Sequence, residues 1–346
     1  MSKPFEVPNS PRILIVRLSA IGDVIHALPL ASSLRERFPR AFIAWLGTDP
    51  SAQLLRQHEA IDELIVLPRR WLASLGQVWE LRRRLRAWKL DAVIDAQGLA
   101  KSAIAALLSG ARRRIGFGDH WGREGSRWLY TDRVLTTTEH TVDRTLELLR
   151  PLGIERPPVR FAVPEGEPER HAVARILHET KVEGQYAVIH SGAGWASKRW
   201  IPERFAAVAQ HLGRAWGLPA IVVWAGEEER RLAERIVERS DGNARLAPPR
   251  NLRELAALSR RARLFVSADS GPLHLAAAVG TPCVGLYGPF PVERHGPYGA
   301  HHLAVQKMTM KGTTSQRRHA PPEVMGSIDV DSVCAACGEI LRRNVA

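Results

Sequence analysis

Short apolar runs alternate with amphipathic stretches along the chain. The first run, RILIVRL at residues 12–18, is followed at 22–38 by GDVIHALPLASSLRERF, whose apolar residues recur at helical spacing. A short apolar run is typical of a buried strand, and a period of 3.6 residues is typical of a helix. Strands that alternate with helices form parallel sheets with crossover connections. The pattern therefore predicts an α/β fold built from doubly wound sheets.

The same alternation continues over most of the sequence. Further strands are expected at 41–47, 62–68, 91–97, 113–118, 186–192, 219–226, 264–268 and 282–288. Further helices are expected near 73–88, 99–109, 140–151, 168–180, 204–216, 227–240 and 251–262. Residues 301–330 show neither period, which predicts a loop, and residues 331–343 favour a last helix with Asp331 as its cap.

A proline-rich stretch separates two halves of the chain. Residues 153–168, GIERPPVRFAVPEGEP, have neither period and are typical of a linker. We predict two Rossmann-like domains, at residues 1–160 and 161–328, that face a central cleft, and a C-terminal helix within 329–346. Ligands of doubly wound sheets bind beyond the carboxyl ends of the strands. The turns that follow the strands are therefore the places where function is expected.

Charge and cysteine content narrow the class of protein. The 346 residues carry a formal charge of +13, which favours acidic partners: nucleic acid, anionic lipid, or phosphorylated or carboxylated substrates. The three cysteines, Cys283, Cys334 and Cys337, make no disulfide framework and fit a reducing compartment. The C-x-x-C pair lacks further ligands at zinc spacing, so we predict no metal site. Since the sequence shows neither a signal peptide nor an apolar span of membrane length, we expect a cytoplasmic protein.

One polar turn interrupts a long apolar stretch of the second half. Asp269, Ser270, Gly271 and His274 fall where a strand becomes a helix, with Pro272 in the first helical turn and Ser270 or Gly271 as the expected helix cap. Free N–H groups and the helix dipole attract anions there, so the turn suits a phosphate surrounded by hydrogen-bonding side chains. The alternative is a capping Asp or Ser with a histidine that is satisfied in the core.

Two other turns of the second half carry similar groups. Ser191 and Gly192 follow a strand in a loop of small residues, and Lys198 comes shortly after, which resembles a phosphate cradle with one cation. The spacing is not that of a nucleoside triphosphatase loop. Glu227 begins a helix where three acids complement the helix dipole, and one of them could accept hydrogen bonds from a ribose. A glycine-rich turn with a solvated lysine is the plain alternative.

The first half has its own polar turns. Asp23 stands in the first turn of the first helix, where it is either a helix cap or a general base that takes a proton from a hydroxyl group. Gln97 and Lys101 repeat this placement after a later strand. Basic residues also gather in this half: Arg69, Arg70, Arg112, Arg113, Arg114 and Arg123.

Residues 71–89 mix tryptophan with basic residues. The tryptophans are Trp71, Trp79 and Trp88, and the basic residues are Arg82, Arg83, Arg84, Arg86 and Lys89. An amphipathic surface helix with a solvated basic face would have this pattern. A second interpretation is attraction to an anionic acceptor or to an anionic membrane surface.

Several of these motifs occur together in one known family. The sequence resembles the ADP-heptose:lipopolysaccharide heptosyltransferases of glycosyltransferase family nine over residues 12–300, and most of all the type I enzymes. The matching motifs are RILIVRLSAIGDVIHALP, DAVIDAQGLAKSA, HSGAG with KRWIPERF, WAGEEER and FVSADSGPLHLAAAVGTP. The resemblance implies a GT-B fold in which the N-terminal domain binds the acceptor and the C-terminal domain binds the nucleotide sugar. It also implies that the C-terminal helix often crosses back to the first domain.

The resemblance further implies an inverting transfer of heptose from ADP-heptose to the Kdo sugar of the lipopolysaccharide inner core, without a metal or another cofactor. Asp23 falls on the catalytic aspartate, and Lys198 would stabilise the leaving group. The donor-binding positions are Ser191, Gly192, Lys198, Glu227, Asp269, Ser270, Gly271 and His274. The acceptor-binding positions are Arg69, Arg70, Gln97, Lys101 and Arg123. We expect a monomer in peripheral contact with an anionic inner membrane.

Three other interpretations stay open. The charge would suit a nucleic-acid-binding protein, but no zinc-finger, RRM or KH motif occurs, and the basic residues are spread over both halves. A sugar-binding relative that had lost the chemistry would not need both Asp23 and Lys198. A family member that uses another nucleotide sugar or another acceptor would share every motif named above.

Overall fold

The structure is a computed structural model that describes residues 8–343. Contacts divide the chain into two compact units, with the boundary between Pro164 and Glu165. This boundary lies inside residues 153–168, the stretch that the sequence marks as a linker. No helix among the described residues is long and apolar enough to cross a membrane.

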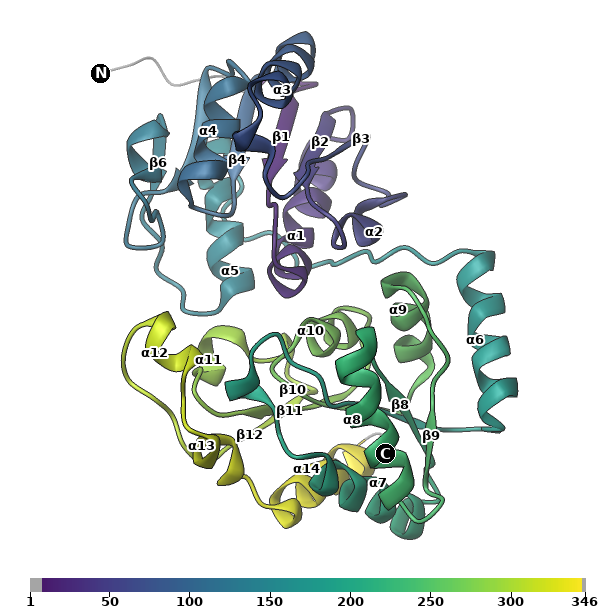
Figure 1. Cartoon of the computed structure of the whole chain (residues 1–346). Coiled ribbons are helices and arrows are strands. Elements are labelled where there is room, and N and C mark those ends of the chain that lie inside the picture. Colours follow the sequence, from purple (N-terminus) through teal and green to yellow (C-terminus); the bar gives the residue numbers. More distant parts are fainter. Residues whose placement is uncertain (1–7, 344–346) are drawn as a thin grey trace. The chain divides into compact units, whose positions relative to one another are not determined.

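The first unit holds one six-stranded sheet in which all paired strands are parallel (Figure 1). Its strands are β1 (Arg12–Val16), β2 (Phe42–Gly47), β3 (Glu63–Val66), β4 (Ala92–Asp95), β5 (Arg113–Phe117) and β6 (Asp132–Val134). They lie in the order β3-β2-β1-β4-β5-β6. The order reverses between β1 and β4, and the turns that follow these two strands diverge there, as at the ligand-binding switch point of other doubly wound sheets.

Helices cover the sheet of the first unit. They are α1 (Ile21–Arg37), α2 (Ala52–Leu55), η1 (Trp71–Ala73), α3 (Leu75–Ala87), α4 (Ala100–Leu108), η2 (Ser126–Leu129), α5 (Thr141–Leu146) and η3 (Glu147–Leu152). Leu14 of β1 packs in one core cluster with Leu81 and Leu85 of α3. Its neighbours Ile13 and Ile15 are fully buried too. Since successive residues of a strand point to opposite faces, both faces of β1 are covered, which explains its unbroken apolar run.

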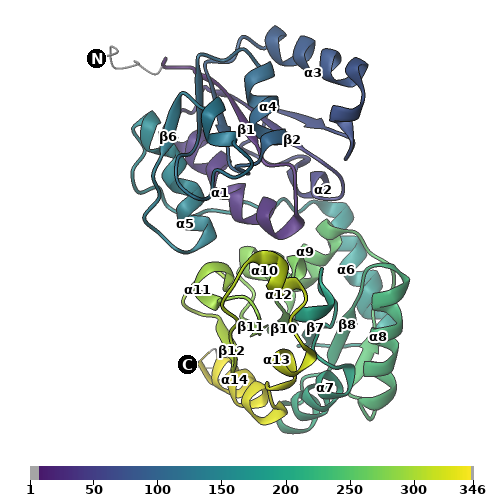
Figure 2. The same cartoon turned by 60° about the vertical axis from the view of Figure 1, so that its left-hand side comes forward.

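The second unit repeats this plan (Figure 2). Its parallel strands are β7 (Ala187–His190), β8 (Ala220–Val223), β9 (Ala244–Leu246), β10 (Leu264–Ala268), β11 (Cys283–Tyr287) and β12 (Leu303–Gln306). The order β12-β11-β10-β7-β8-β9 puts the switch point between β7 and β10.

Two layers of helix flank the second sheet. The helices are α6 (Glu167–Thr180), η4 (Ala196–Lys198), α7 (Pro202–Trp216), α8 (Gly226–Arg239), α9 (Leu252–Arg261), α10 (Gly271–Ala278), α11 (Val292–His295), α12 (Thr314–Arg318), α13 (Pro322–Gly326) and α14 (Val330–Arg343). Phe205 of α7, Ile236 of α8 and Leu341 of α14 share one core cluster with Val222 and Val266 of the sheet. In addition, α9 packs against α6 and α10.

The α/β, doubly wound fold is confirmed, but the prediction of a loop at 301–330 is wrong. Within that stretch β12 pairs with β11, and α12 and α13 follow. These elements have four or five residues each, which is too short to display the hydrophobic period of a strand or of a helix. The edge strands β6 and β9, with three residues each, escaped prediction for the same reason.

The last helix, α14, begins one residue earlier than expected, and Asp331 is not its cap. Asp329 accepts the Ser332 N–H at 2.7 Å through Oδ1 and the Ser332 hydroxyl at 2.9 Å through Oδ2. The helix packs in the second unit, against α7 and β12. Val333 and Cys337 are buried there.

A buried histidine joins the amino ends of β11 and β12. The Cys283 N–H donates to His302 Nδ1 at 3.2 Å, so Nε2 carries the ring proton and faces the Tyr298 carbonyl at 3.1 Å. Burial, and to a smaller extent the neighbouring His301, lowers the pKa of His302 to about 4. Protonation at Nδ1 would remove the acceptor of the Cys283 N–H.

We predict that His302 makes the folded state sensitive to acid. Between its ordinary pKa and about 4, the unfolded chain binds a proton that the folded chain does not, so stability falls as pH falls through this window. The loss between about pH 7.5 and 4.5 should be roughly 2–3 kcal/mol. Urea denaturation at both pH values would measure it in the wild type and in His302→Gln, which does not titrate. Equal pH dependence in the two proteins would contradict the assignment.

Candidate active site

The turn after β10 has the structure that its sequence predicts. Ser270 has extended backbone angles, and its hydroxyl accepts the Leu273 N–H at 3.4 Å, so it is the N-cap of α10. Pro272 stands in the first turn, where its missing N–H has no cost. Gly271 leaves the backbone open to close approach. The free N–H groups of this helix end point beyond the carboxyl ends of the strands.

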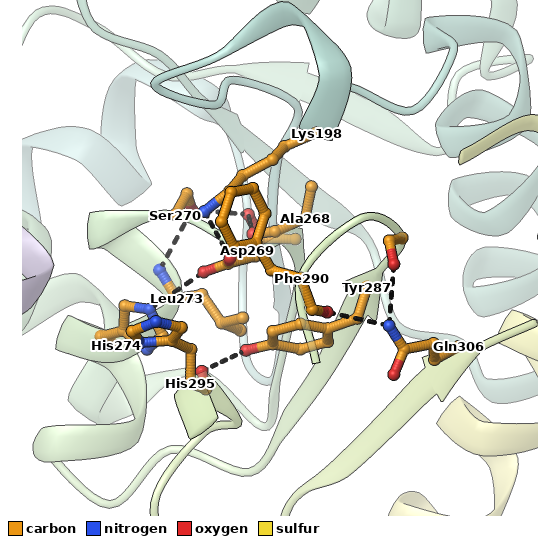
Figure 3. A network of polar contacts seen from close by, with 12 residues as sticks. Lys198, Ala268, Asp269, Ser270, Leu273, His274, Tyr287, Phe290, His295 and Gln306 are labelled. Carbon is orange, nitrogen blue, oxygen red and sulfur yellow. Dashed lines mark hydrogen bonds and ion pairs between the residues drawn. The ribbon is translucent and has the colours of Figure 1, made fainter. Parts of the chain in front are cut away.

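Asp269 lies at the centre of a charged cluster at this turn (Figure 3). The residue is 5% exposed. One carboxylate oxygen pairs with Lys198 Nζ, and the other lies 3.2 Å from His274 Nε2. Burial alone would raise the pKa of Asp269, but the His274 hydrogen bond and the Lys198 charge outweigh it and hold the pKa well below its usual range. Asp269 is therefore ionised at neutral pH.

Lys198 reaches this carboxylate from the end of η4, which follows β7. Its Nζ lies 4.4 Å from the ring centre of Phe290 and 4.8 Å from that of Trp195. The side chain is only 16% exposed. A partly desolvated ammonium between two aromatic rings and one carboxylate is held in place more firmly than a solvated surface lysine.

His190, at the end of β7, ties three turns together. Its Nδ1 lies 3.2 Å from the Ser267 hydroxyl and 3.3 Å from the Ser270 hydroxyl, and its Nε2 lies 3.2 Å from Glu229 Oε2. Glu229 also accepts the Ala225 N–H at 2.8 Å, at the start of α8. Burial would raise the pKa of Glu229, but His190 and this N–H lower it on balance. One imidazole thus bridges the carboxyl ends of β10, β7 and β8.

The loop after β7 fits tightly against this bridge. A Cβ on Gly192 would lie 2.1 Å from Glu229 Oε1, so no residue with a side chain fits there without displacing Glu229. The neighbouring Ser191 hydroxyl is buried and has no hydrogen-bond partner within residues 8–343. Such an orphan hydroxyl is costly unless a ligand satisfies it.

Glu229 was missed by sequence reasoning, which selected Glu227 instead. Glu227 is 64% exposed, and its carboxylate lies 3.6 Å from Arg231. The missed signal is helical spacing, because Glu229 shares a face with the buried Ala233 and Ile236. Glu227 stays a predicted donor-binding residue, exposed in the first turn of α8, which follows β8.

In the first unit, Asp23 has features of both a cap and an accessible acid. Its Oδ2 accepts the Ala20 N–H at 3.3 Å, and its Oδ1 pairs with Arg17 at 2.9 Å, yet the side chain remains 36% exposed. Arg17 also donates to the Ala96 carbonyl after β4. Arg17 therefore joins the turns after β1 and β4. Nothing in the sequence indicated this role, because Arg17 stands near the end of an apolar run.

Gln97 is buried and supports this turn from within. Its Oε1 accepts the Leu18 N–H at 2.8 Å. The backbone turn beneath it is held by Asp95, which accepts the N–H groups of Gln97 and Gly98 at 2.9 and 3.2 Å and the Tyr130 hydroxyl at 2.7 Å. Burial of Asp95 raises its pKa, since the donors around it are uncharged.

Two of the predicted basic residues lie at this turn, and two lie elsewhere. The Arg123 N–H donates to the Gly98 carbonyl at 2.9 Å, which brings Arg123 beside the first turn of α4 and Lys101. Arg69 and Arg70 are exposed after β3, which β2 separates from β1. Within residues 8–343, no group of three or more His, Cys, Asp or Glu side chains could hold a metal ion.

Comparison with known proteins identifies the family. Residues 78–323 match the model of glycosyltransferase family 9 (heptosyltransferase). The chain belongs to glycosyltransferase family 9. It is 32% identical over 307 residues to lipopolysaccharide heptosyltransferase 1 of Salmonella typhimurium, covering 85% of this chain and 93% of that protein. Membership of family 9 makes the chain a glycosyltransferase, as its motifs predict.

Solved family 9 structures share the whole fold. A family 9 glycosyl transferase from Veillonella parvula matches with a TM-score of 0.85 at 24% identity, covering 99% of this chain and 100% of that chain. E. coli heptosyltransferase WaaC with ADP matches with a TM-score of 0.77 at 26% identity, covering 95% and 99%. WaaC with ADP-2-deoxy-2-fluoro heptose matches with a TM-score of 0.75 at 26% identity, covering 96% and 99%. These matches confirm the GT-B architecture.

We predict that removing the His190 ring loosens the three turns that it joins. In His190→Ala, the amides of loop 191–194 and of Ala225 should exchange hydrogen about tenfold faster, because lost buried hydrogen bonds lower the local opening free energy by about 1–3 kcal/mol. Hydrogen exchange followed by mass spectrometry would measure this. His302→Ala is the matched control, because it removes a buried imidazole from the amino end of the same sheet. The prediction fails if both variants loosen loop 191–194 equally.

Proposed function

We propose that the chain transfers heptose from ADP-heptose to the Kdo-containing inner core of lipopolysaccharide, with inversion at the anomeric carbon. The similar Salmonella protein is a lipopolysaccharide heptosyltransferase 1, and WaaC was solved with ADP and with a fluorinated ADP-heptose. The single observation that carries the proposal is the Lys198–Asp269–His274 cluster at the N-terminus of α10, located at the switch point of the second sheet. A nucleoside diphosphate fits the chemistry of this site.

The donor diphosphate would bind at the α10 N-terminus. Gly271 lets the phosphates approach the free N–H groups, and the Ser191 hydroxyl supplies a donor that is otherwise unpartnered within the described chain. In the free protein, Lys198 is paired with Asp269, so the diphosphate shares or takes over this cation. Glu227, exposed at the start of α8, would accept hydrogen bonds from the ribose.

The transfer itself is a direct displacement. An acceptor hydroxyl oxygen bonds to the anomeric carbon of heptose while the bond from that carbon to the phosphate oxygen breaks. The hydroxyl proton goes to Asp23, which Arg17 and the Ala20 N–H hold in place. The electron pair of the broken bond stays on ADP, whose added charge Lys198 and the α10 dipole stabilise. These groups of the chain supply the stabilisation without a metal or a cofactor.

The acceptor would be an anionic glycolipid. Arg69, Arg70, Lys101 and Arg123 are cations of the first unit, and Gln97 supports the turn that holds two of them. We propose a cytoplasmic, monomeric enzyme that meets its acceptor at the inner membrane. A second candidate is a family 9 transferase for another nucleotide sugar or acceptor, and a panel of nucleotide sugars analysed by mass spectrometry would decide between the two.

We predict that Asp23→Asn lowers the transfer rate about 10²–10⁴-fold, the usual contribution of a general base. The amide oxygen of asparagine can still accept the Ala20 N–H, so the cap is retained while the proton acceptor is lost. Steady-state transfer assays would measure the rate, and ADP titration should show unchanged affinity. Near-normal turnover would reduce Asp23 to a helix cap.

We predict that Lys198→Ala and His274→Ala weaken ADP binding by about tenfold or more, because each removes a charged or hydrogen-bonding partner from the phosphate turn. Isothermal titration calorimetry with ADP would measure the affinity. Lys307→Ala is the control, because Lys307 pairs with Asp329 on an exposed part of the same unit. Unchanged affinity in both site variants would place the donor site elsewhere.

A further inference from the structure

The start of α3 exposes large apolar side chains that the described residues of the first unit leave largely uncovered. Leu75 is 88% exposed and Trp79 is 64% exposed, and Leu72 in the preceding η1 is 40% exposed. Both views show α3 on the outside of the first unit (Figures 1 and 2). Clustered exposure of this kind on a folded chain is typical of an interaction surface.

Only one of the three tryptophans of residues 71–89 contributes to this surface. Trp71 is 1% exposed, and Trp88 packs edge-on against Phe42 with 5.4 Å between ring centres. The core face of α3 is formed by Leu81 and Leu85. The interleaved tryptophans and arginines of this sequence therefore lie on two different sides of the segment, one facing the core and one exposed.

Basic residues continue the exposed side. Leu75, Trp79 and Arg82 are spaced by four and three residues, which places them on one helix face. Arg83 lies beside them, with its guanidinium 5.9 Å from the centre of the Trp79 ring. We call these four residues the α3 stripe. Glu80 is the only acid in residues 69–89, and it pairs with Arg83 at 2.8 Å. Arg82 has no ion-pair partner among the described residues.

We propose that the α3 stripe docks the enzyme on an anionic lipid bilayer. The leucine and the tryptophan would enter the boundary between headgroups and acyl chains, and the arginines would bind lipid phosphates, which guanidinium groups contact with two hydrogen bonds. The net charge of +13 adds attraction to such a surface. The apolar residues of the α3 stripe match the acyl-chain layer of an anionic leaflet, and its arginines match the headgroup layer.

This inference rests on the proposed function in one respect: an acceptor carried by lipid gives the enzyme a reason to dock. The docking itself is tested without the reaction. Two other occupants would use the same surface, namely nucleic acid through the arginines or a second copy of the chain through the apolar residues.

The experiment is sedimentation of the full chain with vesicles. Phosphatidylglycerol-rich vesicles should bind the wild type, phosphatidylcholine vesicles should bind it little, and rising salt should release it. Arg82→Gln should lower the partition coefficient about fivefold, the effect of one basic residue near an anionic surface. Leu75→Ser should lower it at least as much.

Matched control variants distinguish a specific effect of the α3 stripe from a general effect of net charge or of exposed apolar surface. Arg84→Gln removes the same charge from α3 on the opposite side, since two residues turn a helix by about 200°. Leu135→Ser removes a leucine that is 68% exposed elsewhere in the first unit. Both should bind vesicles like the wild type.

Several outcomes would overturn the proposal. One is an equal loss of vesicle binding in the stripe variants and the control variants. Another is equal binding of the wild type to neutral and anionic vesicles. The others are release from the vesicles by random DNA, and a dimer in light scattering that Leu75→Ser converts to monomer. Transfer to a water-soluble acceptor fragment should be unchanged in every variant. Vesicle binding without transfer by the wild type would instead remove the proposed function and leave the docking surface intact.

Discussion

A buried carboxylate at the end of the fourth strand organises the site of each unit. Asp95 closes β4 and Asp269 follows β10, and these strands hold the same position in the two sheets. A carboxylate removed from water must be met by hydrogen-bond donors or by cations. Whether uncharged donors or cations surround the carboxylate decides the chemistry that its turn can offer.

In the first unit the partners are uncharged. Burial raises the pKa of Asp95, while Tyr130 and two backbone N–H groups fix its oxygens. The outcome is a rigid turn that presents Gln97 to the loop before Asp23. In the second unit, by contrast, a cation and a histidine meet Asp269 and lower its pKa in spite of burial. One fold position thus serves as a scaffold in one unit and as a charged centre in the other.

Sequence reasoning succeeded where a feature depends on neighbours along the chain. The helix start at Ser270 or Gly271 and the buried run of β1 follow from local order and periodicity, and the structure selects Ser270 as the cap. It failed where a feature depends on packing between distant segments: Glu229 faces His190 only because β7 and β8 are paired, and Trp71 is buried only because the core closes over it. Short edge strands such as β12 carry too few residues for a period and need the neighbouring strand to form.

The pairing of Lys198 also bears on how a leaving group could be stabilised without reorganisation. A solvated lysine would have to lose water and side-chain freedom as the diphosphate charge grows, which weakens its effect on the transition state. Here folding has already desolvated the ammonium between Phe290 and Trp195 and fixed it against Asp269. The carboxylate keeps that cation in place before any ligand arrives, and it stays charged because its own pKa is depressed. In the proposed reaction, folding would therefore position the Lys198 charge before the diphosphate binds.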